Sequence, residues 1–276
     1  MHIAVTGSSG RIGRAIVEMA LAQGHTVVGM DRLRPAPEAA HANFSFHQLE
    51  MTEYHGLESA LRGCDGLIHM AAIPAPGAHP DPWVHNGNVV GSYNALRAAA
   101  EVGIKRVCQA SSVNAIGAAY SRWPRYDYFP VDEQHPTYNE DPYSLSKWIC
   151  EIQADSFARL HAGMTIASLR FHGVAHERQF GGEAERQRDS IAAKALWGWV
   201  SYDACARASL QSLTADFTGH EVFYIVAPDT TMEAPTLELA GLLFPEVPVT
   251  GDLSGRNGFY NCAKAERLLG WKHNAR

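Results

Sequence analysis

Short runs of hydrophobic residues alternate along the chain with longer segments whose apolar positions recur every three to four residues. The short runs indicate buried strands, and the periodic segments indicate helices. The predicted strands cover residues 2–7, 26–31, 66–72, 106–112 and 165–171, and the predicted helices cover residues 13–24, 56–63, 91–103 and 143–161. Strands and helices that alternate in this way predict an α/β fold, in which helices cover both faces of a parallel sheet.

The pattern becomes less regular after residue 171. Residues 202–215 and 261–272 have the character of helices, and residues 220–227 have that of a strand. We therefore expect a first part over residues 1–170 and a small mixed α/β part over residues 171–276, packed together as a single unit.

Residues 120–142 are rich in proline, aspartate and aromatic residues and show no period, which predicts a long loop. Trp123, Tyr126 and Tyr128 lie in this loop. They could wall a substrate pocket or fill the core, and the sequence leaves both alternatives open.

Composition and charge narrow the kind of protein. With 46% hydrophobic and 19% charged residues, the 276-residue chain can bury a substantial core. The net charge of −6 and the scattered basic residues argue against a nucleic-acid partner, and the apolar runs are too short and too interrupted for a membrane span. The N-terminus has no basic leader segment and the five cysteines are far apart, so we expect a cytoplasmic protein with reduced thiols. The 14 histidines show no metal-ligand spacing, so no metal site is expected.

A glycine pattern follows the first predicted strand. Residues 7–13 fit G-x-x-G-x-x-G, which lets backbone N–H groups approach a pyrophosphate at the start of a helix. Asp31 ends the second strand, where an acid can bind an adenosine ribose and repel a 2′-phosphate, which favours NAD. Arg11, Arg32 and Arg34 could instead pair with that phosphate, so NADP stays open as the alternative.

A second motif, Tyr143-x-x-x-Lys147, opens the long helix after the loop. Asp141 and Pro142 suit a helix start, and a spacing of four residues puts Tyr143 and Lys147 on the same face. A nearby ammonium and the cationic nicotinamide of an oxidised cofactor would both favour the phenolate. We therefore predict that Tyr143 is a stronger acid than an ordinary tyrosine.

Three further segments complete a family pattern: "GLIHMAAIP", "NVVGSYNAL" and "ASSVNAIG". Together with the glycine pattern and the Tyr/Lys motif, they resemble the extended short-chain dehydrogenase/reductase family, also called the NAD-dependent epimerase/dehydratase family. The similarity continues through "SLRF" to "AKAERLLGWK" and so covers nearly the whole chain. It implies a Rossmann-type doubly wound parallel sheet. Residues 1–170 would then be the dinucleotide-binding domain that carries the catalytic residues, and residues 171–276 the substrate-binding part.

The resemblance also implies roles for individual residues. Tyr143 would be the acid/base, Lys147 would hold the nicotinamide ribose and lower the pKa of Tyr143, and Ser112 would hydrogen-bond the substrate oxygen. The expected cofactor-binding residues are Gly7, Ser9, Gly10, Arg11, Ile12, Gly13, Asp31, Arg32, Glu50, Met51, Ala71, Ala72, Asn88, Ser111 and Lys147. The expected substrate contacts are Pro74, Val113, Asn114 and His172. His69 is expected to be a structural residue near the nicotinamide.

Local departures from the family pattern bear on the reaction. Relatives that dehydrate nucleotide sugars carry an Asp-Glu pair after the serine, whereas this chain has Val113 and Asn114. The segment "FHGV" after Arg170 and the compact C-terminal part argue against a binding site for the nucleotide of a nucleotide sugar. The short chain and "ASSVNAIG" are more similar to the uronate dehydrogenase branch, although that branch has Asn-His after the serines and a serine in place of Pro74. The arginines at 178, 186 and 188 are candidates for a substrate carboxylate, or belong to a solvated loop.

We therefore expect an NAD(P)-dependent oxidoreductase that moves a hydride between the cofactor and a hydroxyl or carbonyl of a small polar substrate, a sugar or sugar acid. One alternative is a sugar epimerase, which reduces and re-oxidises its cofactor within one turnover. An alternative of another class is a non-catalytic NAD(P)-binding sensor. Relatives dimerise through the helix that contains residues 94–103 and the Tyr143 helix, so a homodimer is expected.

Overall fold

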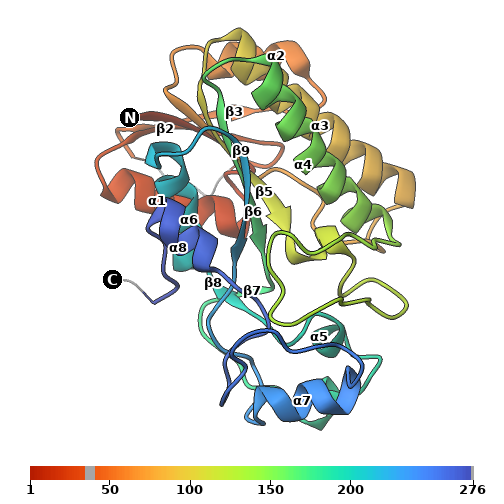
Figure 1. Ribbon diagram of the computed structural model, residues 1–276. Coiled ribbons are helices and arrows are strands. Elements are labelled where there is room, and N and C mark those ends of the chain that lie inside the picture. The colour runs from red at the N-terminus through yellow and green to blue at the C-terminus, as the bar shows by residue number, and fades with distance from the viewer. Residues whose placement is uncertain (35–40, 275–276) are drawn as a thin grey trace.

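The computed structural model describes residues 1–34 and 41–274. Within them, a parallel sheet of seven strands forms the centre of the protein (Figure 1). Its strands, in spatial order, are β3 (Phe44–Gln48), β2 (Thr26–Asp31), β1 (His2–Thr6), β4 (Gly66–His69), β5 (Arg106–Ser112), β6 (Thr165–Phe171) and β9 (Gly219–Ile225). Every neighbouring pair is parallel. The strand order reverses between β1 and β4, and such a switch point opens a crevice at the carboxyl ends of the strands.

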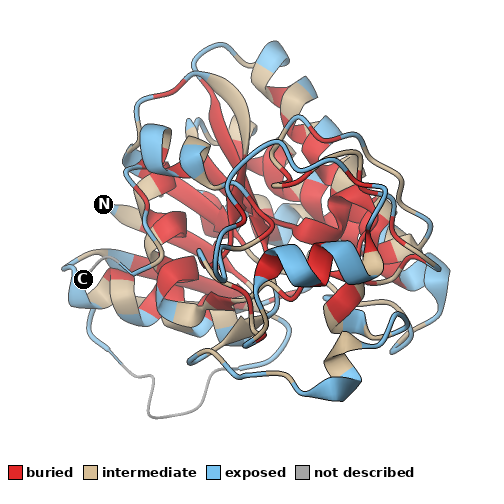
Figure 2. Cartoon of the chain, turned by 60° about the horizontal axis from the view of Figure 1, so that its bottom comes forward, coloured by how far each residue is buried: buried red, intermediate tan, exposed pale blue. Residues whose placement is uncertain are grey.

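Helices cover both faces of this sheet, as Figure 1 shows. One layer consists of α2 (Tyr54–Leu61), α3 (Asp81–Glu101) and α4 (Pro142–Leu160), and the other of α1 (Arg11–Ala22), α6 (Tyr202–Thr214) and α8 (Ala263–Leu269). A separate hydrophobic cluster lies on each side of the sheet, and the strands between the two edge strands are mostly buried (Figure 2). The predicted doubly wound α/β fold is confirmed.

The segment after residue 171 is divided between two places. Its α6, β9 and α8 join the main sheet and its helical layer. The rest forms a small lobe below the sheet in Figure 1, built from β7 (Val174–Ala175), 3-10 helix η3 (Glu183–Arg186), α5 (Ile191–Lys194), β8 (Val200–Ser201) and α7 (Thr236–Leu243). A third hydrophobic cluster fills this lobe.

The loop at residues 120–142 packs into the small lobe. Tyr126 is buried in its cluster, and its hydroxyl donates to the backbone oxygen of Lys194 at 2.6 Å. Trp123 stacks on Phe244 with ring centroids 5.0 Å apart, and the Tyr128 hydroxyl donates to Asp132. Trp123, Tyr126 and Tyr128 are thus core and framework residues and not pocket walls.

Several elements differ from the sequence prediction. Strand β3 is an added edge strand, and its half-exposed residues give only a weak pattern. Helix α3 begins ten residues before the predicted start, at Asp81, because Pro82 fits its first turn. Helix α7 was not predicted. Among the described residues, no helix is both long and apolar enough to cross a membrane.

Candidate active site

The glycine loop joins β1 to α1 by close backbone contacts. Gly7 has a φ of +67°, and a Cβ there would lie 2.7 Å from the Ala71 nitrogen. A Cβ on Gly13 would lie 2.0 Å from the Gly7 oxygen. Gly10 is the N-cap of α1 and supplies no side chain to its free N–H groups. These N–H groups therefore face outward at the positive end of the helix, an arrangement that fits a pyrophosphate.

Asp31 lies at the carboxyl end of β2, beside the glycine loop. Its carboxylate accepts hydrogen bonds from the backbone nitrogens of Ser9 at 3.1 Å and Leu33 at 3.0 Å. These bonds fix the acid at the position where an adenosine ribose would offer its hydroxyls. Arg32 is exposed at the same place and lines the cavity near Asp31.

Two adjoining cavities form one groove along the carboxyl edge of the sheet. The outer cavity, of about 280 Å³, lies near Asp31, and the inner cavity, of about 670 Å³, extends from the glycine loop to Tyr143. All fifteen expected cofactor-binding residues line one or both cavities, as do the substrate candidates Pro74, Asn114 and His172. The structure therefore brings these residues together, and a dinucleotide fits the groove's glycine cradle and acid.

Tyr143 and Lys147 lie on one face of α4 and both line the inner cavity. Asp141 caps this helix by accepting hydrogen bonds from the backbone nitrogens of Tyr143 and Ser144, each at 2.9 Å. The Lys147 Nζ lies 5.9 Å from the centre of the Tyr143 ring and donates to the Ala110 oxygen at 2.9 Å. The predicted pairing of phenol and ammonium within the crevice is present.

Burial dominates the electrostatics of Tyr143 in the protein without NAD. Burial raises its pKa above the ordinary value for tyrosine, and a hydrogen bond from Ser112 offsets this only in part. Burial also lowers the pKa of Lys147. In the protein without NAD, desolvation of the phenolate therefore dominates the pKa of Tyr143. The prediction of an unusually acidic Tyr143 also relied on the cationic nicotinamide, and it stays a prediction for the NAD complex.

Two polar side chains support the site from behind. Asn88 bridges from α3 to the end of β4: its Oδ1 accepts from the Ile73 nitrogen at 2.8 Å, and its Nδ2 donates to Ser146 at 3.0 Å. Ser111 donates to Glu151 at 2.5 Å, so its side chain is turned into the protein. Asn88 and Ser111 thus shape the groove, and their side-chain polar atoms already have protein partners.

The two histidines near the groove are held in the neutral form. His69 is hydrogen-bonded to Thr6 at 2.7 Å, and burial lowers its pKa to about 3. His172 has its Nε2 2.8 Å from the Ala195 oxygen, and its Nδ1 accepts from the Gly173 nitrogen, while burial lowers its pKa to about 4. Because both ring nitrogens of His172 face backbone groups, it meets the cavity through its carbon edge.

One expected substrate contact and three candidate arginines lie elsewhere. Val113 is 2% exposed and belongs to the hydrophobic cluster of the small lobe, because the first turn after Ser112 points it inward. Arg178 pairs with Asp229, Arg186 pairs with Glu238, and Arg188 lies over the Trp123 ring. These arginines form part of the lobe's framework and do not reach the inner cavity.

Sequence reasoning missed several residues that line the inner cavity. Tyr120 packs edge-on against Tyr143 with ring centroids 5.8 Å apart. Phe171, Val174 and Tyr202 line the same cavity from β6, β7 and the start of α6. Their spacing carries no motif. Only the position of Phe171 at the end of a predicted strand, and of Val174 just after it, could have suggested them.

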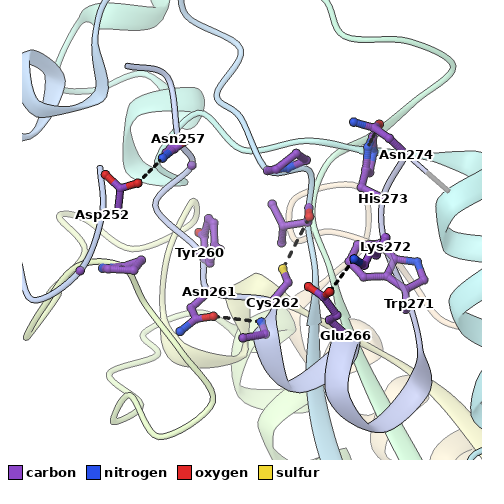
Figure 3. A pocket seen from close by; sticks show the side chains of 16 residues that line it. Asp252, Asn257, Tyr260, Asn261, Cys262, Glu266, Trp271, Lys272, His273 and Asn274 are labelled. Atoms are coloured by element: carbon purple, nitrogen blue, oxygen red, sulfur yellow. Dashed lines mark hydrogen bonds and ion pairs between the residues drawn. The ribbon is translucent and has the colours of Figure 1, made fainter. Parts of the chain in front are cut away.

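A further cavity of about 640 Å³ lies beside α8 and apart from the glycine loop (Figure 3). Its polar side chains pair with one another: Asn257 donates to Asp252 at 2.8 Å, and Lys272 pairs with Glu266 at 2.6 Å. Tyr260 lines this cavity and packs against His172 of the inner cavity. The acid/base candidates Tyr143 and Lys147 line the groove and not this cavity.

Comparisons with known proteins extend this picture. The model of the NAD dependent epimerase/dehydratase family matches residues 3–228. A UDP-glucose 4-epimerase from Lacticaseibacillus casei is 30% identical over 180 residues, which are 63% of this chain and 52% of that protein. Two other curated relatives are covered over 57% and 64% of their length, so the chain spans between about half and two thirds of such proteins.

Solved structures share the fold at low identity. The UDP-glucose 4-epimerase of Thermotoga maritima, solved with UDP-glucose, has a TM-score of 0.74 at 21% identity, over 100% of this chain and 94% of that one. A mutated uronate dehydrogenase has a TM-score of 0.72 at 21% identity, over 99% and 82%. The uronate dehydrogenase is thus one of several similar structures, and the predicted closeness to its branch is not distinctive. The family match runs from the first strand to the loop after β9, and the chain therefore belongs to the NAD dependent epimerase/dehydratase family, whose cofactor is NAD.

Proposed function

We propose that this protein transfers a hydride between NAD and a hydroxyl-bearing carbon of a small sugar or sugar derivative. One observation carries the proposal: Ser112, Tyr143 and Lys147 meet in a single cavity that continues into the glycine loop. A dinucleotide held on the loop would extend along the groove toward these three side chains.

Each side chain then has a distinct task. When bound, NAD would supply the nicotinamide that accepts or returns the hydride. Tyr143 would take the proton from the substrate hydroxyl or give it back, and Ser112 would donate a hydrogen bond to the substrate oxygen. Lys147, anchored on the Ala110 oxygen, would place a positive charge where a phenolate forms. Burial keeps water from competing for these contacts.

The lining of the inner cavity supports an uncharged substrate. Among the described residues that line it, the cationic side chains are Lys147, Arg11 and Arg14, and the two arginines lie at the start of α1 beside the pyrophosphate position. The remaining wall is formed by neutral hydroxyls and carbon surface, including Tyr120, Phe171 and Tyr202. A sugar acid would find no arginine at this end, so we favour a neutral sugar over a uronate.

Epimerisation is the second candidate, and the names of the relatives favour it. Both the relative from Lacticaseibacillus casei and the structure from Thermotoga maritima are UDP-glucose 4-epimerases. An epimerase and a dehydrogenase share the first step, removal of a hydride from the substrate. They differ in whether the reduced cofactor returns the hydride to the same molecule.

A single assay distinguishes these outcomes. Purified protein is incubated with neutral sugars, uronic acids and UDP-sugars, with NAD and NADP in parallel. The absorbance of reduced nicotinamide and the sugar products are followed together. Accumulation of NADH supports the dehydrogenase, and conversion of one sugar isomer to another without NADH supports the epimerase. Tight NAD binding with no turnover of any substrate would favour the sensor and contradict both enzymatic assignments.

We also propose a homodimer formed through α3 and α4. Val90 and Tyr93 on α3 and Ile152 on α4 are exposed apolar residues on these two helices, at 42%, 50% and 45%. Light scattering of the protein and of Tyr93→Lys/Ile152→Lys tests this. A dimer that becomes a folded monomer supports the proposal, and an unchanged oligomeric state contradicts it.

A further inference from the structure

Asn114 has a defined orientation beside Ser112. It is the second residue of the 3-10 helix η2 (Val113–Ile116), whose N-cap is Ser112. The backbone nitrogen of Asn114 donates to Ser112 Oγ at 3.1 Å, and its Nδ2 donates to the same oxygen at 3.3 Å. Its Oδ1 accepts from the Ala119 nitrogen at 2.8 Å. Because a backbone N–H can only donate, the Ala119 contact identifies Oδ1 and leaves Nδ2 facing the serine.

This arrangement restricts what the Ser112 hydroxyl can do. A hydroxyl oxygen has two acceptor positions and one proton. Asn114 occupies both acceptor positions, and both residues are buried, at 5% and 9% exposure. The hydroxyl proton is therefore left to point toward the remaining neighbour, which is the Tyr143 side of the inner cavity.

We propose that Asn114 is a positioning residue that keeps Ser112 an obligate hydrogen-bond donor toward the reacting oxygen. This inference rests on the proposed function and deepens it, and it replaces the expectation that Asn114 contacts substrate. Asn114 donates hydrogen bonds to the Ser112 oxygen, and the Ser112 hydroxyl in turn donates to an oxygen in the cavity. An oxygen that gains negative charge there, on Tyr143 or on the substrate, always meets a donor, which favours its charged form.

Asn114→Asp isolates this role. The carboxylate keeps the size of the side chain and can still accept from Ala119, but it cannot donate to Ser112. Ser112 would turn its proton toward the new carboxylate and offer its oxygen to Tyr143. Asn139→Asp is the matched control, because the Asn139 Nδ2 supports the same turn through the Ala115 oxygen at 3.2 Å and Thr137 at 2.7 Å.

The kinetic test is a double-mutant cycle that combines Asn114→Asp with Ser112→Ala. We expect Asn114→Asp to lower kcat by about tenfold to a hundredfold with little change in NAD affinity, since loss of an oriented donor acts on the transition state. In the Ser112→Ala background the same change should have no further effect on kcat. Additive losses, or an equal loss of kcat in Asn139→Asp, would show a general structural role and overturn the inference.

A second readout needs no turnover. In NAD-loaded protein with carbon-13 at the tyrosine Cζ, the Tyr143 resonance, identified with Tyr143→Phe, reports the hydrogen bonds of the phenol oxygen. We expect Asn114→Asp to move this resonance and Asn139→Asp to leave it in place. A resonance that moves in Ser112→Ala but not in Asn114→Asp overturns the inference. Absence of turnover in the unmodified protein would instead sink the proposed function, and the resonance would still decide the role of Asn114.

Discussion

The groove has an outer end, formed by the glycine loop and Asp31, and an inner end around Tyr143, and the two ends are built in different ways. The outer end consists of close backbone approaches, in which Gly7 and Gly13 leave no room for a side chain. The inner end consists of side chains from β5, α4, β6 and α6, which are far apart in the sequence. The outer end is thus defined by local geometry, and the inner end by the way the whole sheet assembles.

A buried ion pair between β6 and α4 lies behind the inner end. Arg170 on β6 makes two hydrogen bonds to Glu151 on α4, at 2.9 and 2.8 Å, and Ser111 donates to the same carboxylate. We expect Glu151→Ala to lower the free energy of unfolding by about 3–5 kcal/mol, because it leaves a buried guanidinium without its partner. Urea unfolding measures this change.

The double variant Glu151→Leu/Arg170→Met is the control for that experiment. Removal of both charges should recover most of the lost stability. If the double variant is less stable than Glu151→Ala, the loss comes from packing, and the ion pair does not hold the inner end together.

A substitution at the outer end should weaken NAD binding as well as stability. Gly13→Ala places a methyl group 2.0 Å from the Gly7 oxygen, so the loop must shift. We expect a loss of about 1–3 kcal/mol in stability and a weaker NAD affinity by at least about tenfold. Calorimetric titration with NAD and thermal unfolding measure both effects.

Gly241→Ala serves as its matched control. Gly241 lies in α7 with nothing within 4 Å of its missing Cβ, so alanine should add about 0.5–1 kcal/mol of stability and leave NAD affinity unchanged. Equal NAD affinity in Gly13→Ala and Gly241→Ala would contradict the account of the outer end.

The next prediction concerns the effect of pH on the inner end alone. Since burial raises the pKa of Tyr143, the phenol stays protonated at neutral pH. Oxidation needs the phenolate, so its rate should rise up to about tenfold for each pH unit, whereas reduction needs the phenol and should stay nearly constant. Burial lowers the pKa of His69 to about 3 and that of His172 to about 4, so neither histidine adds a change of slope to the pH–rate profile near neutrality.

Initial rates in both directions from about pH 6 to about pH 9 test this dependence. An oxidation rate that is independent of pH, or that falls as pH rises, would contradict a Tyr143 phenol that stays protonated at neutral pH during the reaction.

The same contrast explains what could be predicted from sequence. The helix entry at Asp141, the glycine loop and the acid at the end of β2 are local patterns, and each lies where it was expected. The environment of Tyr143 is not set by its local sequence, because residues from other segments, such as Tyr120, pack against it. The motif identified the pair with Lys147 but gave no measure of the desolvation that dominates the pKa of Tyr143.

The substrate end was harder to predict for the same reason. Val113 and Asn114 are adjacent in sequence, yet one turns into the core and the other toward Ser112. The direction of each side chain depends on the 3-10 turn that begins after β5, which no periodicity marks. The three arginines that were candidates for binding a substrate carboxylate do not line the inner cavity. Two of them pair with acidic residues and the third lies over an aromatic ring of the protein.

The most direct test of the account is Tyr143→Phe, which removes one oxygen atom from the inner end and leaves the outer end untouched. NAD affinity and turnover are measured on the same preparation with whichever substrate the sugar screen identifies. We predict that turnover falls by about a hundredfold or more while the dissociation constant for NAD stays within about twofold. Turnover that stays near that of the unmodified protein would contradict the assignment of Tyr143 as the acid/base and, with it, the proposed hydride-transfer mechanism.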